Sequence, residues 1–401
     1  MKTVRRPRSS FSPAPRAVVL SRRRSTGSVL VVVMITIIFA AAALVIFMDK
    51  ASNDLLVEQR DAVTRRLRIE AYSALEVTLA VLEDFRQAGG NALHSTAEGW
   101  GDPLGFAGYT PADDRKVTIS FEDESGKISL PRTTPVVLTS LFKSWDIPEN
   151  DAEALSDAIT GWTKREHIYT SGLAPSYEQS TLPFEEPRRS IRAFEELAAI
   201  DKVREVFFTE GQPNHYWKRF VDAVSLFDFQ RPNVNGARGD TLAAVALFDP
   251  TQQQTIADYL NGTGSYQTQG PGYFRSPQEA QQIVGASGDL GSFGTAISAL
   301  RIFVTVEEGK TRFRLAAVIA PPNGATTVQT NATAQRLQAS ASTNPVAAQP
   351  NRPNPTQPAP GGAQNPNAAN DRNLRYPFTL LEIRENDEIP PAPPPPPDPT
   401  L

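Results

Sequence analysis

The stretch RRRSTGSVLVVVMITIIFAAAALVIFM, from Arg22 to Met48, decides the fold of this chain. Its uncharged part, residues 28–48, is 21 residues long, and a helix of about that length crosses a hydrocarbon core of about 30 Å. Thirteen of the 21 residues are Val, Leu, Ile or Phe, and each contributes roughly −0.3 to −0.6 kcal/mol to membrane insertion. The sequence therefore predicts one transmembrane helix over residues 28–48.

The charges predict the orientation of this helix. No acid precedes Asp49, whereas eight basic residues do: Lys2, Arg5, Arg6, Arg8, Arg16, Arg22, Arg23 and Arg24. The positive-inside rule then places residues 1–27 in the cytoplasm and the bulk of the chain on the other side of the membrane. The exported part keeps 32 of the 40 basic residues against all 44 acids, so its net charge of about −12 repels polyanions and argues against nucleic-acid binding.

Gly27 stands directly before the apolar run. A secretory signal peptide has an apolar region of only roughly 7 to 15 residues, with its cleavage site beyond that region. An uncleaved signal anchor is the alternative. Cleavage after Gly27 on the cytoplasmic face would instead leave the whole apolar helix attached. Residues 25–28 resemble a type IV prepilin leader, in which this cleavage makes Ser28 the mature N-terminus.

The helix is expected to continue beyond the membrane. Residues 49–87 contain no Gly or Pro, and their apolar positions recur with a period close to 3.5 or 3.6: Leu56, Val63, Leu67, Ala74, Leu75, Leu79 and Leu82. Gly89 and Gly90 then end the helix. Residues 49–88 are thus predicted to extend the helix, either packed on a sheet or as a coiled-coil stalk.

Strand signals lie on both sides of a central region. Residues 116–130 predict the first strands, with a solvated turn at 122–126. Residues 299–319 predict a hairpin with its turn at Glu308-Gly309-Lys310, and residues 376–384 predict a further antiparallel strand.

Two segments are expected to stay outside the folded part. Residues 321–374 are rich in Asn, Gln, Ala, Thr and Pro and nearly lack large apolar side chains, which is typical of a disordered linker. The tail, residues 387–401, is Pro-rich and is expected to be extended.

The central region contains an internal repeat. Residues 128–142 align without gaps on residues 234–248, and the pieces 157–161 and 258–262 follow in the same order. A third pair of matching pieces begins at Ile191 and Phe274. Two helical modules, residues 131–225 and 226–290, account for this pattern.

Taken together, this order of motifs resembles the minor pseudopilin K family of bacterial type II secretion systems. The resemblance covers most of the chain from Ser25 to Arg384, and its sequence motifs are Ser25-Thr26-Gly27-Ser28, Gly126-Lys127-Ile128-Ser129-Leu130, Asp157-Ala158-Ile159-Thr160-Gly161-Trp162, Arg192-Ala193-Phe194-Glu195-Glu196-Leu197 and Asn233-Val234-Asn235. It implies an α+β, pilin-like fold in which a long N-terminal helix packs on an antiparallel sheet. A large helical region of two repeated SAM-like modules would be inserted into that sheet.

The resemblance also implies a role and partners. Family members sit at the tip of a periplasmic pseudopilus with minor pseudopilins I and J, above the major pseudopilin, and a prepilin peptidase processes them at the inner membrane. The fifth residue after the cleavage site is Val32, where shaft-forming pilins carry a Glu that pairs with the amino terminus of a neighbour. An unpaired carboxylate at that depth costs roughly 2.5 to 3.5 kcal/mol, so Val32 suits a subunit without such a neighbour.

Other functions find less support in the sequence. Some family members bind calcium in an Asp-rich stretch after the Trp that corresponds to Trp162, but residues 163–167 here include Lys164 and Arg165, so no metal or cofactor is predicted. Three His residues, no Cys and no hydrolase or nucleotide-binding motif argue against an enzyme such as a membrane-tethered hydrolase. Two alternatives stay open: a minor pilin of a type IV pilus-like system, and a membrane-tethered helix-hairpin-helix protein that binds nucleic acid.

The leader generates a first prediction. Mass spectrometry of the mature protein should find Ser28 at the N-terminus, with a methylated amino group, because Gly27 lies at the cytoplasmic edge of the apolar run. An intact Met1 terminus, or cleavage beyond Ala43, would contradict it.

Overall fold

The computed structural model describes residues 26–112, 115–172, 177, 184–285, 290–327 and 377–386, without the side chains of 26–28. The chain divides into two compact units, Met1–Val63 and Thr64–Leu401. Most of the predicted leader, nearly all of the predicted linker and the Pro-rich tail lie outside the described residues.

One helix, α1 (Thr26–Ala88), runs through the first unit into the second and is 63 residues long. It ends where the two glycines predict, because Gly89 still donates its N–H to the carbonyl of Phe85 (2.8 Å) and Gly90 then takes a left-handed φ of 75°. Residues 29–60 are exposed throughout. In the second unit, α1 buries one stripe of side chains: Leu67, Glu70, Ala71, Ala74, Leu75, Thr78, Leu79, Val81 and Leu82.

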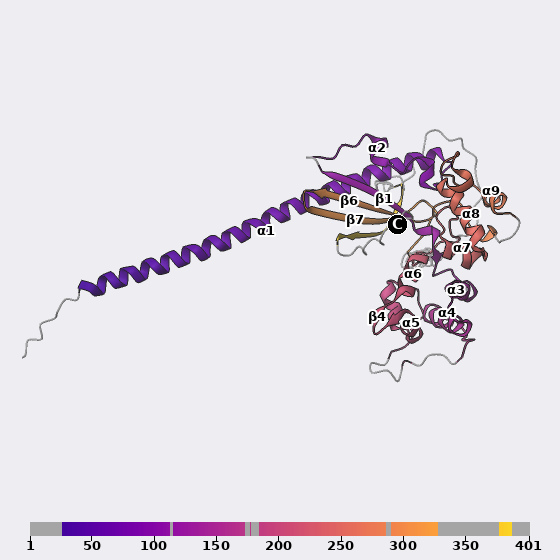
Figure 1. The fold of residues 1–401 in the computed structure, drawn as a ribbon, viewed down its shortest axis with the longest axis horizontal. Helices are drawn as coiled ribbons and strands as arrows, with labels where there is room; N and C mark the ends of the chain where they lie inside the picture. Colours follow the sequence, from indigo (N-terminus) through magenta and orange to yellow (C-terminus); the bar gives the residue numbers. More distant parts are fainter. Residues whose placement is uncertain are drawn as a thin grey trace, which may run out of the picture. The chain divides into compact units, whose positions relative to one another are not determined.

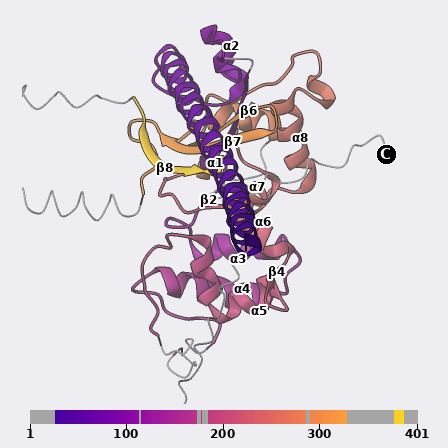
Figure 2. The same cartoon turned by 90° about the vertical axis from the view of Figure 1, so that its left-hand side faces the viewer.

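The second unit contains a four-stranded antiparallel sheet. Its strands are β1 (Lys116–Asp123), β6 (Leu300–Glu308), β7 (Thr311–Ala320) and β8 (Thr379–Glu385), and they lie side by side in that order. The predicted hairpin is present, with Gly309 at a φ of 60° in its turn. Along β6 the buried residues Ile302, Val304 and Val306 alternate with half-buried ones, so one face of the sheet is apolar. Figures 1 and 2 show the part of α1 in this unit lying along the sheet.

The helical region is an insertion into this sheet. Strands β1 and β6 are neighbours, with Asp123 opposite Leu300, so residues 124–299 leave the sheet and return to it at the same end. The predicted fold class, α+β with a long helix on an antiparallel sheet and an inserted helical region, is confirmed by this arrangement.

The insertion contains two cores. The first is formed mainly by α3 (Pro135–Lys143), α4 (Glu149–Thr163), α5 (Asp201–Phe207) and α6 (His215–Ala223), and the second by α7 (Gly239–Ala246), α8 (Pro250–Asn261) and α9 (Pro277–Val284). Helix α7 belongs to both cores, because Ala244 is buried in the first and Leu242 in the second. The aligned stretches of the repeat fall on two helix pairs, α3–α4 and α7–α8, whereas the third elements differ: a 3-10 helix (Phe194–Ala199) followed by α5 in the first case, and α9 in the second.

Short elements complete the described part of the chain. They are α2 (Pro103–Ala107), β2 (Ile128–Ser129), β3 (Phe208–Thr209), β4 (Gln212–Pro213), β5 (Val224–Ser225) and 3-10 turns at Thr96–Glu98, Glu124–Gly126, Gly264–Tyr266 and Leu290–Ser292.

Two expectations for residues 116–130 were wrong. Strand β2 does not join the main sheet but pairs in parallel with β5, which closes the first helical module. The segment 122–126 is not a solvated turn: Glu124, Ser125 and Gly126 are buried. Glu124 forms ion pairs with Lys127 (3.1 Å) and Arg301 (3.3 Å). One local partner, Lys127, and one distant partner, Arg301, therefore make burial of this acidic segment possible.

At Gly126 the buried segment has no room for a side chain. A Cβ on Gly126 would lie 2.2 Å from the carbonyl oxygen of Gly236, which belongs to the segment that enters the second module. The two backbones therefore approach each other more closely than any other residue type allows.

This contact generates a second prediction. Gly126→Ala should lower the free energy of unfolding by about 1–3 kcal/mol, as expected for overpacking against backbone, measured by urea unfolding of the purified chain in detergent. Gly101→Ala is the matched control, because its Cβ would meet only Thr96 at an ordinary 3.5 Å. Equal losses for the two variants would contradict the interpretation.

Candidate membrane and assembly site

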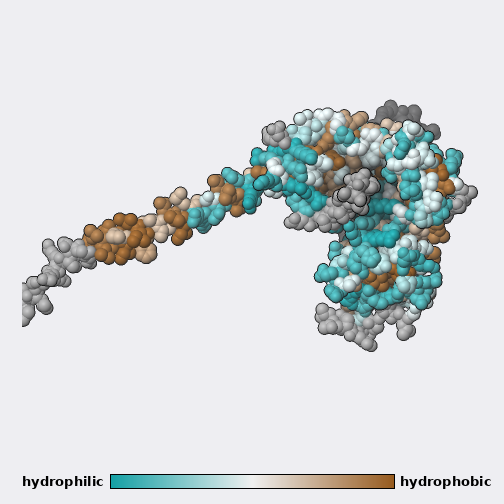
Figure 3. All heavy atoms as spheres, viewed as in Figure 1, coloured by the Kyte–Doolittle hydropathy of each residue, from teal (hydrophilic) through white to brown (hydrophobic). Residues whose placement is uncertain are grey.

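The first part of α1 carries an apolar surface that nothing in its own unit covers. From Val29 to Met48, its 15 large apolar side chains are between 46% (Ile35) and 71% (Phe39) exposed. Figure 3 shows this part of the helix as an apolar segment. Contiguous apolar surface of this extent is unfavourable in water and marks a membrane or protein interface.

The same segment meets the requirements of a lipid environment. It is the one helix among the described residues whose length and composition would allow it to cross a membrane. The one polar side chain in residues 29–48, Thr36, donates its hydroxyl hydrogen to the carbonyl of Val33 at 2.8 Å. Every polar group in hydrocarbon needs such an internal partner, so the segment leaves no side-chain donor unsatisfied.

The predicted site residues lie at the start of this helix. Gly27 and Ser28 belong to its first turn, although their side chains are not described. Val32 lies one turn further on and is 56% exposed, among other exposed apolar residues. The cleavage site and the role of Val32 stay predictions.

In the second unit, two polar clamps hold α1 on the sheet. In the first, Glu70 accepts hydrogen bonds from Arg115 (3.0 Å) and from the hydroxyl of Tyr109 (2.5 Å). Arg115 also donates to Glu308 at the β6–β7 turn (2.9 Å). The side chains of Arg115 and Glu70 are only 6% and 9% exposed. Burial, together with the hydrogen bond to Glu70, raises the pKa of Tyr109 to about 12, so its hydroxyl remains a donor at neutral pH.

The second clamp is at the last residue of β8. Glu385 accepts hydrogen bonds from Arg68 (2.9 Å) and from the hydroxyl of Tyr72 (2.7 Å). Burial raises the pKa of Tyr72, which therefore also stays protonated. The two clamps join α1 to the ends of β6 and β8, near the two sides of the sheet.

The sequence alone does not indicate either clamp, because the partners are far apart along the chain. One signal was available. Glu70 stands within the apolar stripe, between Leu67 and Ala71, and a Glu on a buried helix face needs a cationic partner. The sequence alone could not identify that partner as Arg115.

The motif Asp157-Ala158-Ile159-Thr160-Gly161-Trp162 holds a loop against α4. Asp157 accepts hydrogen bonds from the backbone N–H of Thr170 (2.7 Å) and Ser171 (2.6 Å) and lies 2.9 Å from His167 Nε2. Burial favours a raised pKa, but these donors outweigh it and lower the pKa of Asp157. A Cβ on Gly161 would lie 1.9 Å from the hydroxyl of Tyr169, so a larger residue there would displace that side chain.

The described residues offer little for catalysis. His94 pairs with Glu98 at 2.7 Å and His167 with Asp157, whereas His215 is exposed at the start of α6. No group of His, Cys, Asp or Glu in the described part of the chain is placed to hold a metal ion.

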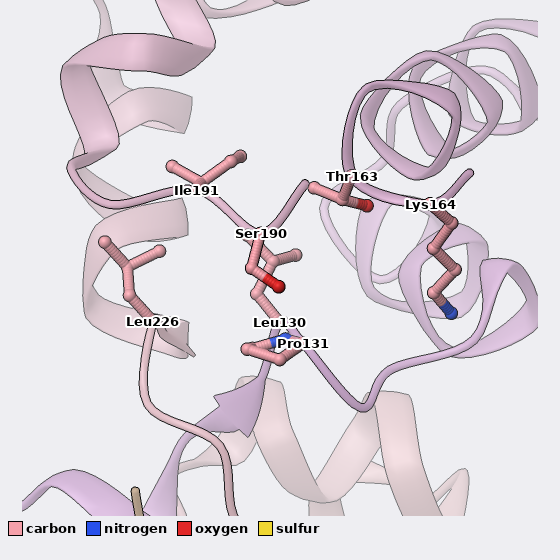
Figure 4. Close-up of a pocket in the computed structure, with 7 residues that line it drawn as sticks. All are labelled: Leu130, Pro131, Thr163, Lys164, Ser190, Ile191 and Leu226. Carbon is pink, nitrogen blue, oxygen red and sulfur yellow. The ribbon is translucent and has the colours of Figure 1, made fainter. Parts of the chain in front are cut away.

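Beside the end of α4 lies a small pocket. It has a volume of ≈ 20 Å³, which is room for about one water molecule. In Figure 4 the amino group of Lys164 points away from Ser190, and it donates instead to the carbonyl of Thr133 at 2.7 Å. Sites for small-molecule substrates have volumes of roughly 300 Å³ or more, so this pocket does not suggest one.

Comparison with known proteins adds one finding. The chain matches no family model and no curated protein. Among solved structures it is similar to a chain of the GspK-GspI-GspJ complex from the type 2 secretion system of enterotoxigenic Escherichia coli. The identity is 12% and the TM-score 0.44, and the match covers 65% of this chain and 93% of that chain. Type II secretion is also the system of the family that the sequence resembles. At this level of identity and TM-score, the similarity does not show what this chain does, so its function has to be inferred from its own residues.

The buried clamp generates a third prediction. Glu70→Gln should lower the free energy of unfolding by about 3 kcal/mol, near the lower end for breaking a buried ion pair, because Arg115 keeps Glu308 as a partner. The control is Glu149→Gln, which removes the exposed partner of Lys143 and should have a much smaller effect. Urea unfolding in detergent measures both losses, and a Glu70→Gln loss no larger than the control would contradict the clamp.

Proposed function

We propose that this chain is a non-enzymatic minor pseudopilin that sits at the tip of a type II secretion pseudopilus, initiates its assembly and supports protein export across the outer membrane. It would be a single-pass protein of a bacterial inner membrane, with residues 1–27 in the cytoplasm and the second unit in the periplasm. Minor pseudopilins I and J and the major pseudopilin would be its assembly partners. A prepilin peptidase would cleave it after Gly27.

The observation that carries this proposal is that one continuous helix joins an exposed apolar segment to a sheet. Residues 29–48 are apolar all round, as lipid requires, whereas residues 67–82 bury a single stripe. Enzymes with a membrane tether have no need of a helix that continues from the membrane into the folded unit. A subunit that must pass from the membrane into a filament has that need.

Two features support the tip position. Val32 supplies no carboxylate to pair with the amino terminus of a neighbouring subunit. Within the second unit, Arg66 and Arg68 of α1 meet Glu308 and Glu385 at one end of the strands, and the insertion leaves from Asp123 and Leu300 at the other end. In the proposed tip position, the bulk of residues 124–299 would occupy the distal end and block a further subunit.

A fourth prediction tests the tip role. Deleting the gene should impair secretion or filament initiation while the major subunit stays stable, and an epitope on the wild-type chain should label one filament end. Val32→Glu should add epitopes along the shaft, because a carboxylate at that position can pair with a neighbour's amino terminus. Folding of the second unit should not change.

Val31→Glu is the matched control. It places a carboxylate at nearly the same depth but about 100° away around the helix, where pairing would fail. Both changes cost roughly 2.5 to 3.5 kcal/mol in lipid, which the apolar run can absorb. Wild-type epitopes repeated along the shaft would refute the tip assignment. Loss of pili with normal secretion would favour the type IV pilus alternative. A gel shift with DNA would favour the helix-hairpin-helix alternative.

A further inference from the structure

Strand β8 forms one margin of the four-stranded sheet and carries two exposed apolar side chains. It is the last strand in the order β1-β6-β7-β8 (Figure 2), and no described strand pairs with its outer edge. Leu380 is 45% exposed and Ile383 is 37% exposed. An open edge that also exposes apolar side chains invites pairing with the edge of another sheet, and folded proteins usually cover or block such an edge.

A β-bulge places both side chains on one face of the sheet. The register of β8 on β7 shifts between Val318 and Ile319, so Leu380 lies opposite Ile319 and Ile383 lies opposite Ala317. On a regular strand, two residues that are three positions apart point to opposite faces. Because the bulge adds one residue to β8, the two exposed side chains instead lie on the same side, next to each other.

That face is the one on which α1 lies. Glu385 shares it with Ile383, two positions away, and accepts hydrogen bonds from Arg68 and Tyr72 of α1. The helix therefore reaches the end of β8 through polar contacts but leaves Ile383 and Leu380 partly uncovered. An occupant of this margin has to be narrow and apolar.

The chain supplies a candidate occupant directly after β8. Fifteen residues, 387–401, follow Asn386, and eight of them are Pro. Asn386 redirects the chain, because it has a left-handed φ of 47° and its Oδ1 accepts a hydrogen bond from the backbone N–H of Arg314 in β7 at 3.0 Å. The point at which the tail leaves the sheet is thus fixed beside the end of β8.

We propose that residues 390–399 lie back along the outer edge of β8 and cover Leu380 and Ile383, so that the tail closes this margin of the sheet to other chains. The tail is long enough. Ten residues of polyproline helix extend about 31 Å, whereas the seven residues of β8 extend about 23 Å. This inference does not depend on the proposed function.

Composition favours the tail over a strand of another chain as the occupant. Pro has no N–H with which to continue a sheet, so a Pro-rich segment ends the ladder instead of offering a new edge. Its apolar rings lose little conformational entropy when they are ordered. Attachment beside the site also gives the tail an effective concentration that is roughly millimolar, which a second copy of the chain has to exceed.

Disulfide trapping tests this fifth prediction, because the chain contains no Cys of its own. Thr379→Cys lies at the exposed start of β8 and leaves Leu380 and Ile383 intact. It is paired with Ala392→Cys or with Pro394→Cys in the full chain in detergent micelles. These tail positions lie about 19 and 25 Å from Asn386 along a polyproline helix, on either side of the about 23 Å that separates Thr379 from Asn386 along an extended strand.

At least one of the two pairs should form an intramolecular disulfide about tenfold faster than the control, because docking raises the local concentration of the tail beside β8. The control is Thr118→Cys, exposed on β1 at the opposite margin of the sheet, combined with the same tail positions. A tail that is not docked reaches both margins. Equal rates at the two margins, or no disulfide with either tail position, would overturn the proposal.

The single variant Thr379→Cys tests the closure of the margin. Replacing residues 390–399 by Gly and Ser at equal length should increase its disulfide-linked dimers at least about tenfold, because two half-exposed apolar side chains are then uncovered. Leu380→Ser added to that chain should suppress the dimers again. Dimers that form equally well with the native tail would mean that a second copy occupies the margin, and the proposal would fall.

Discussion

Burial of one stripe of α1 on the apolar face of the four-stranded sheet is the contact on which the second unit depends. An antiparallel sheet of this size needs a partner for its apolar face, and the helix supplies Leu67, Leu75, Leu79 and Leu82, each no more than 4% exposed. Apolar contact alone is not directional. The two clamps supply direction, because Glu70 and Glu385 fix where along the strands the helix lies. Without these two clamps, α1 could shift along the sheet by one helical turn and still contact apolar surface.

The sheet places a second constraint on the chain, since β1 and β6 are neighbours although residues 124–299 separate them. Loop-closure entropy grows only slowly with length, so such an insertion adds little cost if it folds by itself. Its two cores meet this condition, with α7 shared between them. The parallel pair β2–β5 then brings the start and the end of the first module together. The close contact of Gly126 with Gly236 joins the start of the second module to the turn that follows β1.

The sequence predicts the parts of this fold that depend on local pattern. Periodicity and the absence of Gly and Pro identify α1, alternation identifies the β6–β7 hairpin, and the repeat identifies the helix pairs α3–α4 and α7–α8. The parts that it misses depend on partners far along the chain. Nothing near Ile128 indicates that it pairs with Val224, and the acidic run at 122–124 suggests solvent until Arg301 is placed beside it. For the candidate site, composition indicates the membrane helix, whereas the tip role of Val32 rests on the family resemblance.

The two parts of α1 are subject to different physical rules, although their backbone is continuous. Lipid contacts every side of residues 29–48 in a membrane, so their composition matters and their spacing does not. The sheet contacts one side of residues 67–82, so their spacing matters, and a single Glu is tolerated at position 70 because Arg115 reaches it. A substitution that exchanges two apolar residues should thus be nearly neutral in the first part. In the second part the same exchange would change packing. Val32 is the exception in the first part. In the proposed assembly, this one position decides whether a carboxylate is present to pair with the amino terminus of a neighbouring subunit.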